Sequence, residues 1–451
     1  MTKAAPGPKG YPLVGVVPFM IKHGAEYLMS VFQRHGDVAE LKLLGPMRMF
    51  LISHPDGVEY VLKKNHRNFL VKRPSMHLEA MMGKGLTMSN GDLWLHQRRL
   101  MQPAFHRQKI EAMAASTARH VAERIGHWEN AGPIDLASEM EQLSLNAMLA
   151  ALFGSGVSRS ETRRITDAVE LVLRVAGRGM FLEVPPFIPT PENLRVKRAL
   201  KDLTHVVLGL IEQRRHASEE QCNDLLSLLL QAHDDATAMS EQQLRDEVTS
   251  VLVAGYESTA VTLTWMFYLL SQNPEVEHRL RQEIASVLGD RAPTMADLSS
   301  LEYLNRVISE SMRCYPAFWA MTRETIADDE IGGYRVPARS LIVVSPFVTH
   351  KHPGFWEEPD RFDPDRFSAE RSAGRHRFSY FPFGAGPRVC IGERQAQMVL
   401  QLSLVTILQK YRMKPVADHP IEIHTAMTIR PKHGMLMDVF PAGQRDFSSI
   451  P

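Results

Sequence analysis

Cys390 is the residue whose type and surroundings most clearly suggest chemistry, and it is one of three cysteines in the chain of 451 residues. Gly384, Gly386 and Gly392 lie close to it in sequence, and glycines permit the tight turns that would aim backbone N–H groups at a sulfur atom. Such N–H groups, the neighbouring Arg388 and a following helix would stabilise a thiolate. A thiolate held in this way is a soft ligand that suits a single metal centre. A lone cysteine elsewhere is more often a small buried apolar residue.

A second group of reactive side chains interrupts the longest helical pattern, which runs over residues 240–272. Glu257, Ser258 and Thr259 stand in the middle of this largely apolar run. Polar groups in a buried helix are costly unless they have partners, and Gly255 costs about 1 kcal/mol relative to alanine in a helix interior. We therefore expect something to approach the helix backbone closely at Gly255. A kinked helix whose hydroxyls bond its own carbonyls is the simpler alternative.

Basic side chains supply a third type of chemistry. Trp94 and Arg98 are four residues apart, so they share one face of a helix predicted to begin near Gly91. Arg323 follows the apolar turn Pro316–Met321. Arginine is a natural partner for a carboxylate because its planar guanidinium binds both oxygens. A solvated basic face with a packed tryptophan also explains Trp94 and Arg98.

The spacing around Cys390 resembles the haem-binding loop of the cytochromes P450, the haem-thiolate monooxygenases. That loop reads Phe-Gly-x-Gly-x-Arg-x-Cys-x-Gly, and every specified position is filled here, by Phe383, Gly384, Gly386, Arg388, Cys390 and Gly392. The resemblance implies a mainly α-helical fold with a smaller β region. It also implies haem b between the long central helix and the helix after the loop, with Cys390 as the metal ligand.

Further motifs resemble those of the same family and occur in its order. The resemblance implies contacts to the haem propionates from Trp94, Arg98, Arg323 and Arg388. It implies that Ala254 and Gly255 lie over the haem, and that Glu257 manages protons together with a neighbouring hydroxyl. Ser258 stands where the family has threonine and Thr259 follows it, so which hydroxyl relays protons stays open. A buried triad that supports the Cys390 loop is implied for Glu310, Arg313 and Arg366.

Composition excludes several other classes of protein. The 52 basic and 51 acidic residues give a net charge of +1, which offers no case for nucleic-acid binding. Cys222, Cys314 and Cys390 form no CxxC pair, which excludes a zinc ribbon and a disulfide framework. The apolar stretch Tyr11–Ile21 is short and broken by two prolines, so we expect no membrane anchor. We expect a cytoplasmic monomer.

The pattern of breakers predicts one domain over residues 1–451, with β-rich parts at approximately 36–70, 323–347 and 420–440. Helices are predicted at about 25–35, 274–288 and 301–315, and an irregular segment at 69–90. A substrate pocket is expected to draw on five segments: 69–88, 181–188, 251–258, 316–321 and 425–428.

The function implied by the resemblance is insertion of one oxygen atom of O2 into a medium-to-large apolar substrate, by hydroxylation or epoxidation. Because the motifs occupy nearly the whole chain, a separate ferredoxin or flavodoxin-type protein and its reductase must supply the electrons. A peroxide-driven or isomerising haem-thiolate enzyme is the alternative. From another class, a haem-free helical binding protein would require the motifs to be coincidental.

Overall fold

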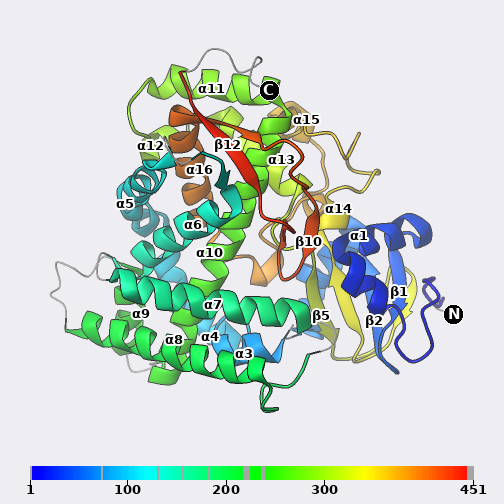
Figure 1. Ribbon diagram of the computed structural model, residues 1–451. Coiled ribbons are helices and arrows are strands. Elements are labelled where there is room, and N and C mark those ends of the chain that lie inside the picture. Colours follow the sequence, from blue (N-terminus) through cyan, green and yellow to red (C-terminus); the bar gives the residue numbers. More distant parts are fainter. Residues whose placement is uncertain are drawn as a thin grey trace.

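The protein is described here by a computed structural model that covers residues 3–72, 75–128, 132–154, 157–179, 183–216, 224–234 and 239–443. Helices occupy most of the molecule, and a smaller β region lies beside them (Figure 1). The predicted fold class is therefore confirmed. Cys222 and the first two residues of the predicted pocket segment 181–188 lie outside the described residues.

Helix α10 (Glu241–Gln272) runs through the middle of the helical part (Figure 1). The hydroxyl of Ser240 caps it by accepting a hydrogen bond from the N–H of Gln243 at 3.2 Å, and Pro274 begins the next helix. The helix packs most extensively against α6 (Leu136–Phe153). It also contacts α13 (Glu302–Cys314) and α16 (Glu393–Lys410). The predicted helix over residues 240–272 is confirmed.

The other helices surround this centre. Helices α7 (Arg159–Gly179) and α8 (Pro191–Arg215) pack side by side across the lower front face in Figure 1. The remaining helices are α1 (Val17–His35), α2 (Pro55–Glu59), α3 (Met76–Met82), α4 (Gly91–Met101), α5 (Arg107–Ile125), α9 (Leu225–Asp234), α11 (Pro274–Leu288), α12 (Met295–Leu298), α14 (Pro346–Thr349) and α15 (Ala369–Ser372).

The largest sheet has five strands in the order β1-β2-β8-β5-β3. Its only parallel pairing among the described strands is β2–β8. The strands are β1 (Val38–Lys42), β2 (Arg48–Ile52), β3 (Phe69–Val71), β5 (Met321–Thr325) and β8 (Leu341–Val344). Smaller sheets are formed by β6 (Asp329–Ile331) with β7 (Tyr334–Val336), β10 (Ile423–Thr425) with β11 (Ile429–Pro431), and β4 (Ile134–Asp135) with β12 (Leu436–Pro441) and β9 (Tyr411–Pro415).

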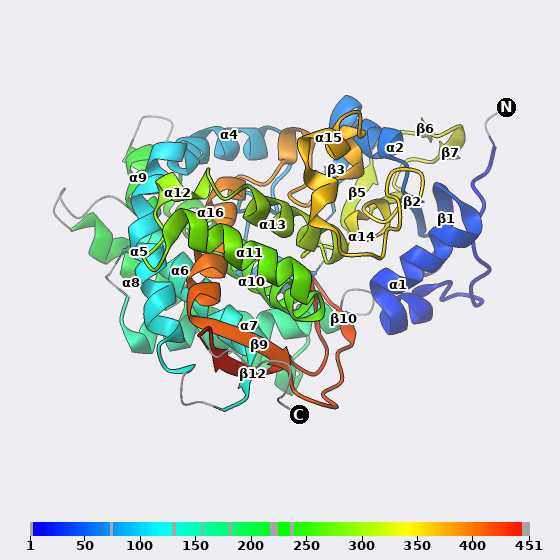
Figure 2. The ribbon, with the colours of Figure 1, turned by 90° about the horizontal axis from the view of Figure 1, so that it is seen from above.

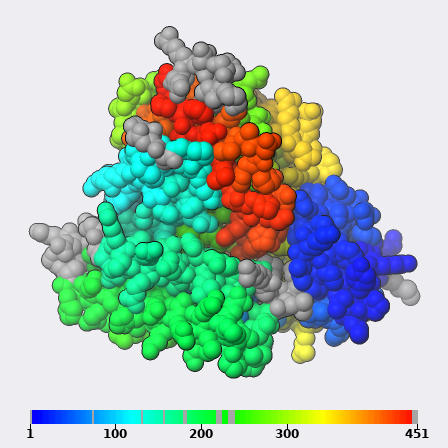
Figure 3. All heavy atoms as spheres, in the orientation of Figure 1, coloured from blue at the N-terminus to red at the C-terminus, as the bar shows by residue number. Residues whose placement is uncertain are grey.

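The C-terminal strands lie between the helical part and the N-terminal segment. Figure 2 shows β9, β10 and β12 along one side of the molecule, next to α10 and α11. In the space-filling view, the orange and red C-terminal part lies between the cyan helices and the blue N-terminal segment (Figure 3). The predicted β-rich parts all contain strands, whereas the short strands β4 and β9 were not predicted.

One expectation about the N-terminal quarter was wrong. The segment 69–90 is not irregular throughout, because it holds β3 and α3, whose first turn is capped by the Ser75 hydroxyl. The predicted helix at about 25–35 is present as the part of α1 that follows a kink at the non-helical Gly24, and a further helical segment from Val17, which was not predicted, precedes the kink. Gly24 has a φ of 43°, and a Cβ there would lie 2.3 Å from the Cβ of Thr425. Within the described residues, no helix is long and apolar enough to cross a membrane.

Candidate functional site

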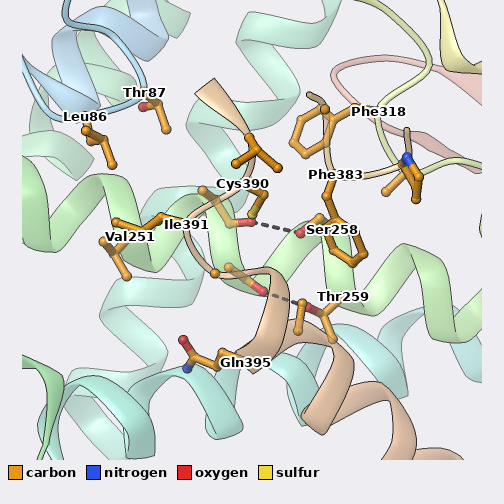
Figure 4. Close-up of a pocket in the computed structure, with 18 of the residues that line it drawn as sticks. Leu86, Thr87, Val251, Ser258, Thr259, Phe318, Phe383, Cys390, Ile391 and Gln395 are labelled. Carbon is orange, nitrogen blue, oxygen red and sulfur yellow. Dashed lines mark hydrogen bonds between the residues drawn. The ribbon is translucent and has the colours of Figure 1, made fainter. Parts of the chain in front are cut away.

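A cavity of about 370 Å³ lies between α10, α16 and the loop that ends at Cys390. Figure 4 shows Phe383 and Cys390 of this loop around the same space as Ser258 and Thr259 of α10. Predicted pocket segments 69–88, 251–258 and 316–321 contribute lining residues, among them Leu86, Thr87, Val251, Phe318 and Met321. The segment 425–428 and the described residues 183–188 do not line the cavity.

The loop before Cys390 depends on two left-handed glycines. Gly384 has a φ of 73° and Gly386 a φ of 71°, which larger residues adopt with difficulty. A Cβ on Gly386 would lie 2.0 Å from the carbonyl oxygen of Leu62. The N–H of Cys390 donates to the carbonyl of Phe383 at 2.9 Å, which closes the loop. The loop therefore places Cys390 shortly before α16, where Cys390 is exposed to the cavity.

The thiol of Cys390 is surrounded by protein although it opens onto this interior space. Burial raises its pKa, while a hydrogen bond from the N–H of Gly392 and the charge of Arg98 act in the opposite direction. Because the net effect is a raised pKa, the loop alone does not keep the Cys390 thiol in the expected thiolate form. A bound metal ion would provide the remaining stabilisation, because coordination displaces the thiol proton. Gly392 lines the cavity, and a Cβ there would lie 4.0 Å from the sulfur of Cys390.

Three arginines at one end of the cavity lack an anionic partner. Arg98, Arg323 and Arg388 all line the cavity, and none forms an ion pair with a carboxylate of the described residues. Their guanidinium groups donate instead to backbone carbonyls, such as that of Val389. Burial lowers the pKa of Arg323 and of Arg388 to about 10. Buried cations without counter-ions call for an anionic ligand, and a pair of carboxylates would suit them.

Trp94 is part of the same end of the cavity. The guanidinium of Arg388 lies 4.4 Å from the centre of the Trp94 ring, in a cation–π contact. Arg388 also donates to the side-chain oxygen of Asn90 at 3.1 Å. The predicted propionate residues are thus brought together by α4, β5 and the Cys390 loop. This donor set lines the same cavity as the thiol of Cys390 and fits a haem with its two carboxylates.

The motif in α10 is divided between two faces of the helix. Ala254, Gly255, Ser258 and Thr259 line the cavity, but Glu257 does not. The Ser258 hydroxyl donates to the Ala254 carbonyl and the Thr259 hydroxyl to the Gly255 carbonyl, both at 2.9 Å (Figure 4). The alternative of hydroxyls bonded to their own helix therefore describes both side chains in this structure.

Glu257 is held outside the cavity wall by Thr428, from a segment that was predicted to line the pocket, and by Arg430, which the sequence did not single out. Its carboxylate accepts a hydrogen bond from Thr428 at 2.8 Å and a charge-assisted one from Arg430. Arg430 also lies 3.9 Å from the carboxylate of Glu141 on α6. No local sequence pattern predicts the contact with Arg430, because Arg430 lies on β11, more than 150 residues after Glu257. Only the packing of β11 against α10 and α6 brings the three charges together.

The expected triad behind the Cys390 loop is present. Arg313 donates to both carboxylate oxygens of Glu310, at 2.7 and 2.8 Å, and Arg366 lies 3.4 Å from the same carboxylate. All three side chains are buried. Arg313 also donates to the carbonyl of His350, whose ring nitrogen accepts the N–H of Phe381 at 2.9 Å. The triad is therefore linked through one residue to the start of the loop.

Comparisons with known proteins agree with this geometry. The family model described as Cytochrome P450 matches residues 5–437. The cyclooctat-9-en-7-ol 5-monooxygenase of Streptomyces melanosporofaciens is 36% identical over 423 residues, 92% of this chain and 90% of that protein. The pentalenene oxygenase of Streptomyces avermitilis is 34% identical over 429 residues, 94% of each chain. Among solved structures, retinoic acid-bound cyanobacterial CYP120A1 has a TM-score of 0.87 at 22% identity, over 98% of this chain and 100% of that one, which shows the shared fold.

Proposed function

This chain belongs to the cytochrome P450 family, and from that premise we propose that it is a monooxygenase of large apolar, terpene-like molecules that uses haem b. The observation that carries the proposal is the single cavity that joins a thiol, an unpaired arginine cluster and apolar walls. Such a cavity offers a ligand, a carboxylate anchor and a substrate chamber in one place. We assign all of residues 1–451 to one haem domain.

In this proposal Cys390 ligates the iron, and Arg98, Arg323 and Arg388 hold the propionates beside Trp94. When bound, the haem supplies the redox chemistry that activates O2, which the thiolate ligand favours. Phe383, Gly384 and Gly392 shape the wall next to Cys390, and Ala254 and Gly255 shape the opposite one. Because these residues enclose the cavity, their contribution is to orient the reactants and to exclude water.

Glu257, Ser258 and Thr259 are proposed to handle the protons of the reaction. For this role a hydroxyl of α10 must turn from its own helix carbonyl toward the cavity, since both hydroxyls are back-bonded in the described conformation. Ser258 and Thr259 are equivalent in this respect. Thr259 has the more restricted rotamer, because its extra methyl group stiffens χ1.

The substrate class rests on two observations. Much of the remaining cavity wall is apolar, with Leu86, Val251, Phe318, Met321, Ile391 and Val399 among its residues. Two of the similar proteins are named for the oxidation of cyclooctat-9-en-7-ol and of pentalenene. A cyclic terpene skeleton satisfies both observations, because it is large, rigid and apolar and binds without much loss of its own entropy.

Electrons are proposed to come from a separate ferredoxin or flavodoxin-type protein with its reductase, and the enzyme to work as a cytoplasmic monomer. The exposed cations Arg99, Arg377 and Arg394 would attract an acidic partner. Arg375 is left out of this surface, because its guanidinium lies 4.3 Å from the centre of the Trp356 ring. Arg107 is paired with Glu111 at 2.5 Å.

The first test is the absorption spectrum of the dithionite-reduced protein under carbon monoxide. A strongly red-shifted Soret band is expected, and it should disappear in Cys390→Ala. Cys314→Ala is the control, since Cys314 is a buried cysteine that does not line the cavity: its sulfur accepts a hydrogen bond from Arg313 at 3.3 Å, and burial raises its pKa to about 12. A haem protein without the shift, or a shift that survives in Cys390→Ala, would overturn the proposal. Terpene oxidation with peroxide but not with reductase and O2 would favour the peroxide-driven alternative.

A further inference from the structure

Ser144 of α6 is a buried hydroxyl that faces the cavity without a partner. It is 2% exposed, it lines the cavity, and its oxygen forms no hydrogen bond with the described residues. By contrast, Ser258, Thr259 and Thr262 of α10, which line the same cavity, all donate to carbonyls of their own helix. A buried hydroxyl without a partner is costly, so its position suggests a ligand or an ordered water.

Glu141 stands three residues before Ser144 on α6. Residues three apart lie on the same face of a helix, with their Cβ atoms about 5 to 6 Å apart. The side chain of Glu141 is 30% exposed, whereas that of Ser144 is buried. One helix face therefore carries a carboxyl that reaches solvent and, one turn further, a hydroxyl that reaches the cavity. Ser144 lines the cavity but Glu141 does not, so a connection between the two groups requires one water molecule along their shared helix face.

We propose that Glu141 and Ser144 are the outer and inner groups of a proton path that enters the cavity along α6. The proposal rests on the proposed function, because reduction of O2 is what consumes the protons. In each transfer, solvent protonates the Glu141 carboxylate, and the carboxyl gives its proton to the bridging water. That water protonates the Ser144 oxygen as the Ser144 hydroxyl releases its own proton to water in the cavity. One proton enters, and no bond other than the O–H bonds changes.

The charges around Glu141 suit this role. Burial raises the pKa of Glu141 to about 7, so the group exchanges protons readily near neutral pH. Arg430 of β11 lowers that pKa, while Glu170 of α7, Glu257 of α10 and Asp135 raise it. Arg430 contacts both Glu141 and Glu257 and so keeps the second carboxylate directed away from the cavity. The path through Ser144 reaches the cavity without requiring Glu257 to leave Arg430.

The first experiment measures the carboxyl group itself, in haem-loaded protein without reductant. Infrared spectra over about pH 5 to about pH 9 should show a carboxyl band from Glu247, whose pKa burial raises to about 8, and a separate band from Glu141 that titrates near neutrality. The Glu141 band should be absent in Glu141→Gln and shifted in frequency in Ser144→Ala, because the hydrogen-bonded chain is broken. Ser403→Ala is the matched control, since Ser403 of α16 is a fully buried hydroxyl without a partner that does not line the cavity.

The second experiment measures how the consumed reducing equivalents are divided between oxidised substrate and hydrogen peroxide. Glu141→Gln and Ser144→Ala should each lower the product-to-peroxide ratio about 10-fold, and Glu141→Gln should remove the pH dependence of that ratio near neutrality. The double variant should resemble either single variant, because both groups act on one path.

Three results would overturn the proposal: a Ser144→Ala enzyme that behaves as the wild type, effects that multiply in the double variant, or an equal loss in Ser403→Ala. Failure of the proposed function is distinguishable from these. In that case the wild type forms no oxidised product, whereas the infrared band still reports whether Glu141 and Ser144 are connected.

Discussion

The Cα of Gly255 on α10 faces the thioether of Met148 on α6: a Cβ built on Gly255 would lie 2.5 Å from the Met148 sulfur. This contact explains a glycine in the interior of the longest helix, where it is otherwise unfavourable. The sequence led us to expect a close approach at this point. The structure identifies the approaching group as a protein side chain that lines the same cavity.

The effect of Gly255→Ala on the unfolding free energy should therefore change sign when the Met148 side chain is removed. In the wild type, the added methyl group crowds Met148 and should cost about 1 to 3 kcal/mol of unfolding free energy, partly offset by the better helix propensity of alanine. In a Met148→Ala background, the same change should stabilise the protein by about 1 kcal/mol. Denaturant unfolding of the four proteins measures this coupling. Equal effects in both backgrounds would show that Met148 is not what requires the glycine.

Replacing Arg313 should strongly destabilise the protein. Arg313→Met leaves the Glu310 carboxylate buried with Arg366 and the N–H of Asp363 as its partners, and breaking such a buried pair costs about 3 to 5 kcal/mol. Since Arg313 is linked through His350 to the loop before Cys390, the haem content should fall together with the stability. Arg361→Met is the matched control, because its pair with Glu358 is exposed and should contribute little. Similar losses in both variants would argue against a special role for the triad.

Arg323→Met should have opposite effects on the two forms of the protein. Without haem, the substitution removes a buried cation that has no counter-ion, so the midpoint of denaturant unfolding should rise. Haem affinity should fall about 10- to 100-fold, because a charge-assisted hydrogen bond to a propionate is lost. Titration of the haem-free protein with haemin measures the affinity. Arg335→Met, at an exposed pair with Asp328, should change neither quantity, and a lower stability of the haem-free Arg323 variant would contradict the argument.

Glu247 should make the protein less stable as the pH rises. Burial raises the pKa of this fully buried carboxyl from 4.5 to about 8. Between these values the folded protein keeps a proton that the unfolded chain has released, so unfolding free energy falls with increasing pH. Glu247→Gln should remove this loss, with the largest stabilisation above pH 8 and none below pH 4.5. Thermal melts across this range test it, with the exposed Glu302→Gln as control.

His77 should hold the connector before α8 in place. Its ring contacts Glu183 through Nδ1 and the side-chain oxygen of Asn193 through Nε2, the latter at 2.9 Å. The amide nitrogen of Asn193 donates to Pro185 and Ile188, which leaves its oxygen to accept from the ring. His77→Leu should therefore increase hydrogen exchange in residues 183–193 at least several-fold. Unchanged exchange there, with His278→Gln on the surface of α11 as the reference, would contradict the assignment.

Much of the fold and part of the site follow from the sequence alone. The cap at Ser240, the stop at Pro274 and the spacing of apolar residues determine α10, because these signals act within one or two helical turns. Gly384, Gly386 and Cys390 likewise specify their own loop through backbone conformations that only glycine adopts readily. The resemblance of the motifs to a known family then indicated which distant residues belong to one site.

The tertiary structure decided which way the site residues face. Glu257, Ser258 and Thr259 are consecutive in sequence, yet the two hydroxyls line the cavity while the carboxyl is turned to Arg430 and Thr428. The partner of Glu257 comes from β11, and no spacing rule connects a helix with a strand so far along the chain. The same holds for Ser144 and Glu141, whose roles depend on where α6 packs against α10. Local sequence determines the elements, whereas the contacts between buried charges depend on long-range packing that only the folded chain establishes.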